Sequence, residues 1–76
     1  MHDPTPLKQF THYGMQASYH YADDSAKEWG LAREAVSQAM LLYRAHPECR
    51  EEMRAAGKEF LWALDFKLKA EKIDNE

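Results

Sequence analysis

The chain has 76 residues, a formal net charge of −3 at pH 7 and one cysteine, Cys49. This length allows one domain with a marginal core, because such a short chain buries only roughly 60% of the surface that it exposes when unfolded. The lone cysteine excludes an internal disulfide, and the acidic balance argues against a dedicated nucleic-acid binder, which normally has a basic face. The unpaired thiol, a beginning without signal-peptide features and the lack of an apolar run of about 20 residues predict a cytoplasmic protein without a membrane span.

The first segment, FTHYGMQASYHY at residues 10–21, contains no Lys, Arg, Asp or Glu and has two interpretations. Thr5 and Pro6 supply a cap and a first helical residue, and apolar residues then recur at helical spacing. Three tyrosines, a methionine and an alanine at alternate positions from 13 to 21 suit a strand instead, but no other segment offers a second strand to pair with it. We expect a helix at 6–21. The alternative is a strand at about 10–21 that pairs with its copy in a dimer and precedes a long α-hairpin.

The second segment has a clear beginning and end. Ser25 and Glu28 form a capping-box pattern, in which the serine hydroxyl accepts a backbone N–H and the acid reaches back. Pro47 pushes the residue before it out of helical geometry, so the helix should span 26–45. Its apolar positions cover about half of the circumference, whereas a surface helix needs a stripe of little more than about 100°. We therefore expect neighbours on two sides of this helix.

The last segment predicts the longest helix. Pro47 fits a first helical position, acidic residues follow it, and lysines occupy the last turns, as the helix dipole favours. One apolar face, with Met53, Phe60, Leu64 and Leu68, is expected to point into the core. The predicted fold is a single all-α domain of residues 1–76, with three helices at about 6–21, 26–45 and 47–72 and with frayed ends at 1–5 and 73–76. We expect it to be oligomeric, because small chains without disulfides often need a partner for stability.

A second apolar line follows the same helix. Trp62 and Phe66 point more than about 100° away from the first line, and Ala70 and Ile73 continue at helical spacing. Tryptophan is enriched at the energetic centres of protein interfaces. We expect these four residues to form an exposed interface through which the chain makes a homodimer.

Candidates for chemistry are few. His46 and Cys49 form an H-x-x-C pair of zinc-ligand types, but strong zinc signatures contain two tight pairs. Cys49 also falls on the apolar face, where a free cysteine behaves as a small hydrophobe. The glycines are too scattered for a phosphate-binding loop, and no nucleophile has an evident orienting partner. We predict no metal, no cofactor and no enzymatic activity.

The strand alternative leads to a different function. The order strand, helix, helix resembles the ribbon-helix-helix repressors, whose paired strands enter the DNA major groove. This resemblance implies a dimeric DNA-binding transcriptional regulator. Arg50, Arg54 and Lys58 form a basic row at i, i+4 spacing that could contact phosphates or another anionic partner. The segment at 10–21 lacks Lys and Arg, however, so DNA binding is the second hypothesis.

The first hypothesis is a small cytoplasmic module for protein–protein interaction. It is expected to be homo-oligomeric and to act as an adaptor, regulator or inhibitor of a partner protein. Small inhibitors made by phages and plasmids have this general profile. The expected partners are a second copy and a protein, and not nucleic acid or a membrane.

Overall fold

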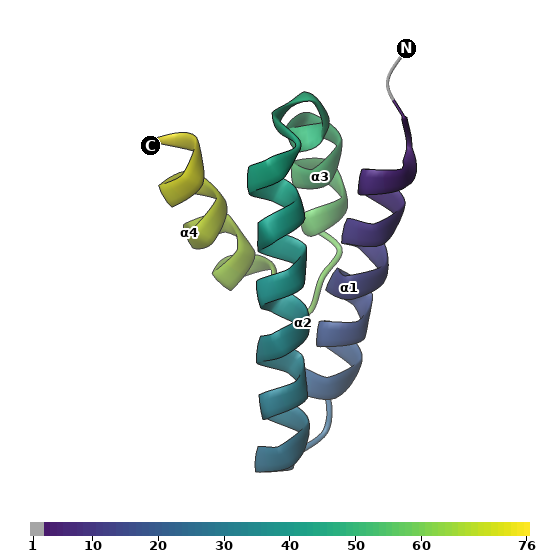
Figure 1. The fold of residues 1–76 in the computed structure, drawn as a ribbon. Coiled ribbons are helices and arrows are strands. Elements are labelled where there is room, and N and C mark those ends of the chain that lie inside the picture. Colours follow the sequence, from purple (N-terminus) through teal and green to yellow (C-terminus); the bar gives the residue numbers. More distant parts are fainter. Residues whose placement is uncertain (1–2) are drawn as a thin grey trace.

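α1 (Thr5–Tyr21) and α2 (Ala26–Ala45) form an antiparallel pair that runs along the length of the molecule (Figure 1). The computed structural model describes residues 3–76. Ser25 caps α2 as predicted, since its Oγ accepts the backbone N–H of Glu28 at 3.5 Å. The Glu28 carboxylate contacts the His20 Nδ1 of α1 instead of reaching back to the cap, and this contact joins the two helices near their turn.

Residues 10–21 lie within α1, and the alternative of a strand there is wrong. Thr5 is the first residue of α1 and not its cap: Pro4 holds the cap position without a side-chain cap hydrogen bond, and the Asp3 Oδ1 accepts the Thr5 hydroxyl at 2.7 Å and the Thr5 backbone N–H at 2.9 Å. These two hydrogen bonds lower the pKa of the Asp3 carboxyl. The buried side of α1 contains Phe10, Gly14 and Ala17. A helix pairs its backbone groups within itself, whereas a lone strand leaves them without partners.

The helix expected at 47–72 is divided. A 3-10 turn, η1 (Pro47–Cys49), leads into α3 (Arg50–Gly57), and α4 (Ala63–Asp74) follows a turn at 58–62. Residues 3–76 therefore form four α-helices and not three. α4 continues through Asp74, beyond the point where fraying was expected to begin. Residues 1 and 2 of the other end expected to fray lie outside the described residues.

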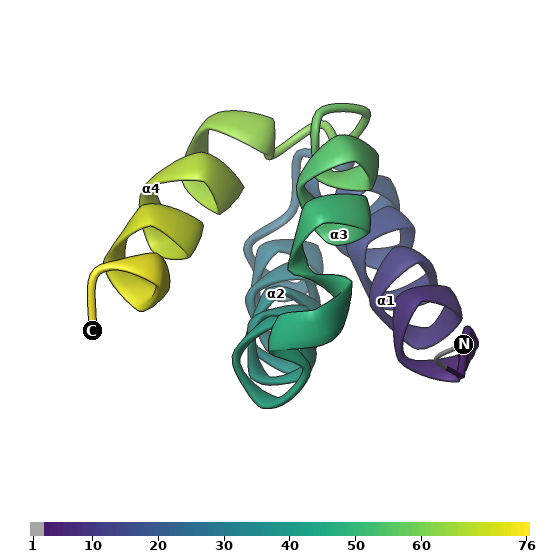
Figure 2. The same ribbon diagram turned by 90° about the horizontal axis from the view of Figure 1, so that it is seen from above.

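The turn at 58–62 is held by α1. The Trp62 indole Nε1–H donates to the Gly14 carbonyl at 2.8 Å, and the Leu61 backbone N–H donates to the Ser18 hydroxyl at 2.9 Å. A continuous helix would carry Trp62 away from the core. The turn instead lets α4 fold back on the opposite side of α2 from α1 (Figure 2).

The core is built around one aromatic cluster. Ring centroids lie 5.5 Å apart for Phe10 and Phe60, 5.6 Å for Phe10 and Phe66, and 5.7 Å for Tyr43 and Phe66. Trp62 stacks on Phe60 at 4.9 Å. We call these five residues the aromatic cluster: Phe10, Tyr43, Phe60, Trp62 and Phe66.

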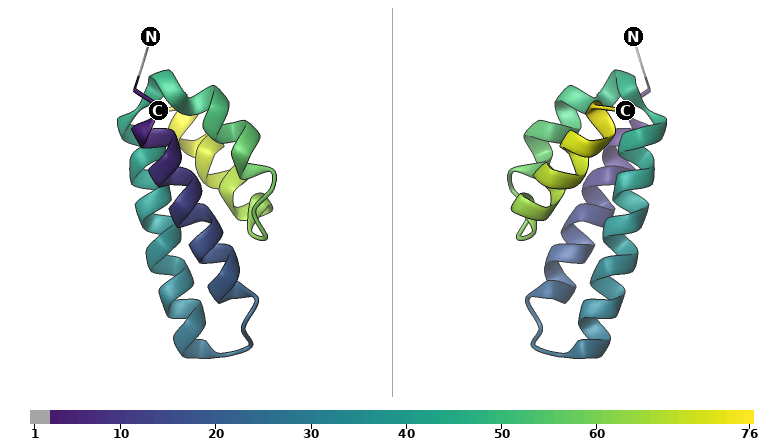
Figure 3. Two further views of the ribbon diagram at one scale, coloured as in Figure 1. Left: turned by 90° about the vertical axis from the view of Figure 1, so that its right-hand side faces the viewer. Right: turned by 90° about the vertical axis from the view of Figure 1, so that its left-hand side faces the viewer.

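The cluster lies toward one end of the molecule. The α1–α2 hairpin extends beyond α3 and α4 at the other end (Figure 3), and the molecule measures 40 × 24 × 18 Å. Within residues 3–76, none of the helices combines the length and the apolar character that crossing a membrane requires.

Candidate protein-docking surface around α4

The turn at 58–62 decides which side of α4 is buried. Phe66 is 4% exposed, and Trp62, just before the helix, is 6% exposed; Ala70 and Ile73 are buried too. The four residues expected to form an exposed interface therefore lie in the core, and the prediction of their exposure is wrong. Leu64 and Leu68, expected inside, are 81% and 67% exposed. Met53 and Phe60 are buried as expected, so the two apolar lines are exchanged only within α4, because the turn rotates this helix about its axis relative to a continuous helix.

Three exposed leucines follow one another in the last segment of the chain. Leu61, in the turn, is 65% exposed, and Leu64 and Leu68 follow at spacings of three and four residues. Leu64 and Leu68 share one side of α4, because residues four apart on a helix are neighbours, and Leu61 lies in the turn just before this helix. We call these three residues the leucine face. Single apolar residues are common on protein surfaces, but a group of large ones marks an interaction site.

The carboxyl end of α4 is fixed by a polar network. The Tyr43 hydroxyl donates to the Asp74 carboxylate, with both oxygens at 2.9 Å, and accepts from the Arg54 guanidinium at 3.0 Å. Arg50 lies with its guanidinium carbon 5.3 Å from the centroid of the Tyr43 ring. Burial raises the pKa of the Tyr43 phenol, and the hydrogen bond to Tyr43 raises that of the Arg54 guanidinium. The network joins the ends of α2 and α4 through α3.

The basic row predicted to contact an anionic partner largely serves this network. Arg50 donates from Nε to the Tyr43 carbonyl at 3.0 Å and from a terminal nitrogen to the Arg44 carbonyl at 3.1 Å. Its guanidinium thus supplies hydrogen-bond donors to two carbonyls in the last turn of α2. Arg54 contacts Tyr43 and Asp74. Lys58 instead lines a groove between α3 and α4. The three cations thus do not form one free strip.

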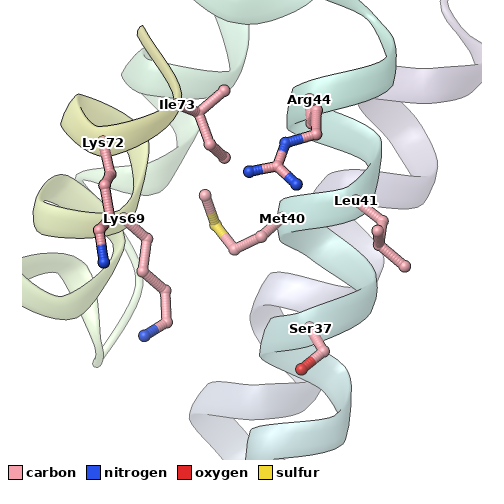
Figure 4. A pocket seen from close by; sticks show the side chains of 7 residues that line it. All are labelled: Ser37, Met40, Leu41, Arg44, Lys69, Lys72 and Ile73. Atoms are coloured by element: carbon pink, nitrogen blue, oxygen red, sulfur yellow. The ribbon is translucent and has the colours of Figure 1, made fainter. Parts of the chain in front are cut away.

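Two grooves flank α4. The groove between α3 and α4 has a volume of about 450 Å³ and an apolar floor that includes Phe66 and Ala70; its lining also holds both cations and acids. The groove between α2 and α4 has a volume of about 360 Å³, and no acidic residue lines it. Figure 4 shows the α2–α4 groove with Met40 and Ile73 reaching toward each other from the two helices. Its lining residues are Ser37, Met40, Leu41, Arg44, Lys69, Lys72 and Ile73.

The two side chains of the candidate metal pair have different environments. Cys49 is buried in the core, where desolvation raises the pKa of its thiol. His46 ends α2, and its Nδ1 lies 3.1 Å from a carboxylate oxygen of Glu48. Within residues 3–76, the His, Cys, Asp and Glu side chains nowhere form a group of three that could hold a metal ion.

No protein-family model matches the chain, and the comparisons with curated proteins and with solved structures also find no similar protein. The features of the molecule that bear on its function are therefore those of its own surface. The leucine face and the two grooves are the candidate surfaces for noncovalent binding. The spacing of the three leucines was visible in the sequence, but a continuous helix placed Leu64 and Leu68 inside, and only the fold places α4 beside α2.

Proposed function

We propose that this chain is a non-enzymatic, cytoplasmic protein–protein interaction module that self-associates and acts as an adaptor, regulator or inhibitor of a partner protein. The leucine face is the observation that carries the proposal. Leu64 and Leu68 of α4 and Leu61 of the turn before it are three large apolar side chains left exposed within eight residues of a chain with a small core. Burying a leucine can contribute about 1.5 to 3 kcal/mol, which is substantial for a small domain.

We place a second copy of the chain on this face. Lys67 and Glu71 lie one helical turn apart beside Leu64 and Leu68. In a two-fold symmetric pair each contact occurs twice, so an antiparallel arrangement of two α4 helices lets Lys67 of each copy meet Glu71 of the other. Opposite charges at the rim of an interface favour one arrangement over others. The resulting dimer leaves the α2–α4 groove of each copy for another partner.

Sedimentation equilibrium tests the dimer. The wild-type protein is expected to dimerise at tens of micromolar, and the double variant Leu64→Lys, Leu68→Glu to be monomeric, because it removes both apolar side chains without changing the net charge. Both positions are exposed in the isolated chain, so far-ultraviolet circular dichroism of the variant should remain that of the wild type.

Met15→Lys is the matched control. Met15 is also an exposed apolar residue, but it lies on α1 and outside the leucine face. This variant should remain dimeric. A wild-type protein that is monomeric at these concentrations, or a double variant that still dimerises, contradicts the proposed self-association.

A further inference from the structure

We infer that the α2–α4 groove binds an acidic amphipathic helix of a partner protein. The floor is apolar, with Met40 and Ile73 almost fully buried where the two helices approach, and with Leu41 more exposed on α2. Side chains of this kind accept the apolar side of a helix that lies along a groove. Methionine is well suited to such a surface, because its flexible thioether adapts to different shapes.

Three cations specify the charge of the bound helix. Arg44 approaches from α2, and Lys69 and Lys72 come from α4, so positive charge lies on both walls (Figure 4). The walls thus present cations to either edge of an inserted helix. Glutamate or aspartate residues beside its apolar side can reach them.

The present partners of these cations can be exchanged. Arg44 pairs with Glu76 at 2.6 Å, and Lys69 pairs with Asp65 at 3.1 Å; all four side chains are substantially exposed. Exposed ion pairs contribute only about 0 to 1 kcal/mol, so a carboxylate of a bound helix can replace them at little cost. Within residues 3–76 Lys72 makes no ion pair.

The shape and charge favour this occupant over two others. α1 lies on the opposite side of α2 and does not cover the groove (Figure 2), so the groove is not the enclosed cavity that would surround a lipid chain. The α4 helix of a second copy carries three lysines but also Asp65, Glu71 and Asp74, so it has no net negative charge to match the three cations of the groove. An acidic helix from another protein matches both the open shape and the charge.

Methyl signals in nuclear magnetic resonance spectra test the inference. Ile73 is the only isoleucine of the chain, so selective labelling gives one signal from the floor of the groove; labelled Met40 gives a second, and Met15 on α1 an internal control. The probe is a synthetic amphipathic peptide with leucines at positions i, i+4 and i+7 and glutamates beside them. Its control carries lysine at every glutamate position. The glutamate peptide is expected to shift the Ile73 and Met40 signals, leave Met15 unchanged, and bind less tightly as salt is added.

Charge reversal locates the binding. The double variant Lys69→Glu, Lys72→Glu should weaken binding of the glutamate peptide about tenfold or more, whereas Lys8→Glu, Lys27→Glu, with the same change of net charge outside both grooves, should have little effect. The Leu64→Lys, Leu68→Glu variant should keep the Ile73 shift, which separates this test from that of the dimer.

Equal binding of the two peptides, or equal loss of binding in the two charge variants, overturns the inference. So does an Ile73 shift caused by dodecanoate but not by the glutamate peptide, because it identifies a lipid ligand.

Discussion

At the scale of single residues, Tyr43 connects the core to the surface of the protein. Its ring belongs to the aromatic cluster and is fully buried, while its hydroxyl bonds to Asp74 and Arg54. A hydrogen bond to a charged group contributes more than one between neutral groups, roughly 1.5 to 3 kcal/mol. The hydroxyl therefore fixes the end of α4 and, with it, one wall of each groove.

Replacement of Tyr43 by Phe is expected to lower the free energy of unfolding by about 1 to 3 kcal/mol at pH 7. Burial raises the pKa of this phenol in the folded protein, so the folded state favours its neutral form. The contribution is complete below the unfolded pKa of about 10 and is lost as the pH rises through the higher folded value. The difference between wild type and Tyr43→Phe should therefore shrink above about pH 10. Urea unfolding at pH 7 and pH 11 measures it.

Tyr19→Phe serves as the control, because the Tyr19 side chain is exposed on α1. It should change the stability by no more than about 0.5 kcal/mol at either pH. A Tyr43→Phe difference that is the same at pH 7 and pH 11 contradicts the role assigned to the buried phenol.

At the scale of elements, the turn at 58–62 packs on α1, and this packing determines where α4 lies. Gly14 is the point of closest approach: a Cβ at this position would overlap the Phe60 ring, and the Gly14 carbonyl accepts the Trp62 indole N–H. A Cβ at Gly57 would likewise overlap the Phe66 ring. Gly30 of α2 differs, because a Cβ there would have open space around it.

Alanine at two of these glycines should have opposite effects. Gly30→Ala is expected to raise the free energy of unfolding by about 0.5 to 1 kcal/mol, because alanine is the better helix former and meets no neighbour. Gly14→Ala gains the same propensity but displaces Phe60 from a packed core, and should lower stability by about 1 to 3 kcal/mol. Thermal unfolding followed by circular dichroism compares the two variants. Stabilisation by both would mean that the turn does not pack on α1 as described.

At the scale of the whole molecule, one core serves all the helices. Phe10 of α1 lies within 6.5 Å, centroid to centroid, of aromatic rings from α2, the turn and α4. α3 adds the buried Met53 to the same core. A small domain with one shared core is expected to unfold in a single cooperative transition.

Phe10→Ala should lower the free energy of unfolding by about 3 to 5 kcal/mol, since it removes a large buried ring that touches several elements. The loss should appear at the same urea concentration in the far-ultraviolet signal of the helices and the near-ultraviolet signal of the aromatic cluster. Exposed Met15→Ala on the same helix provides the comparison and should stay within about 0.5 kcal/mol of the wild type. Separate transitions for the two signals would show instead that α4 unfolds independently.

Local signals in the sequence were sufficient for the fold class and for the first two helices. Helical periodicity and the absence of a second strand predicted α1, and the Ser25 cap and Pro47 predicted the limits of α2. Each of these signals acts over a few residues, through backbone hydrogen bonds or steric limits on the chain. The sequence therefore determined an all-helical protein and the boundaries of its first two helices.

Only the tertiary structure decided the path of residues 58–62 and the side of α4 that is buried. Leu64 with Leu68, and Trp62 with Phe66, are each apolar lines that a continuous helix could direct inward. The choice depends on contacts with residues more than 40 positions away, such as the hydrogen bond from Trp62 to Gly14. Breaking the helix gives up a few local hydrogen bonds, and burial of Trp62, Phe66 and Ile73 against α1 and α2 offsets that cost. The same turn also creates the leucine face, because the orientation of α4 that buries Trp62 and Phe66 leaves Leu64 and Leu68 exposed.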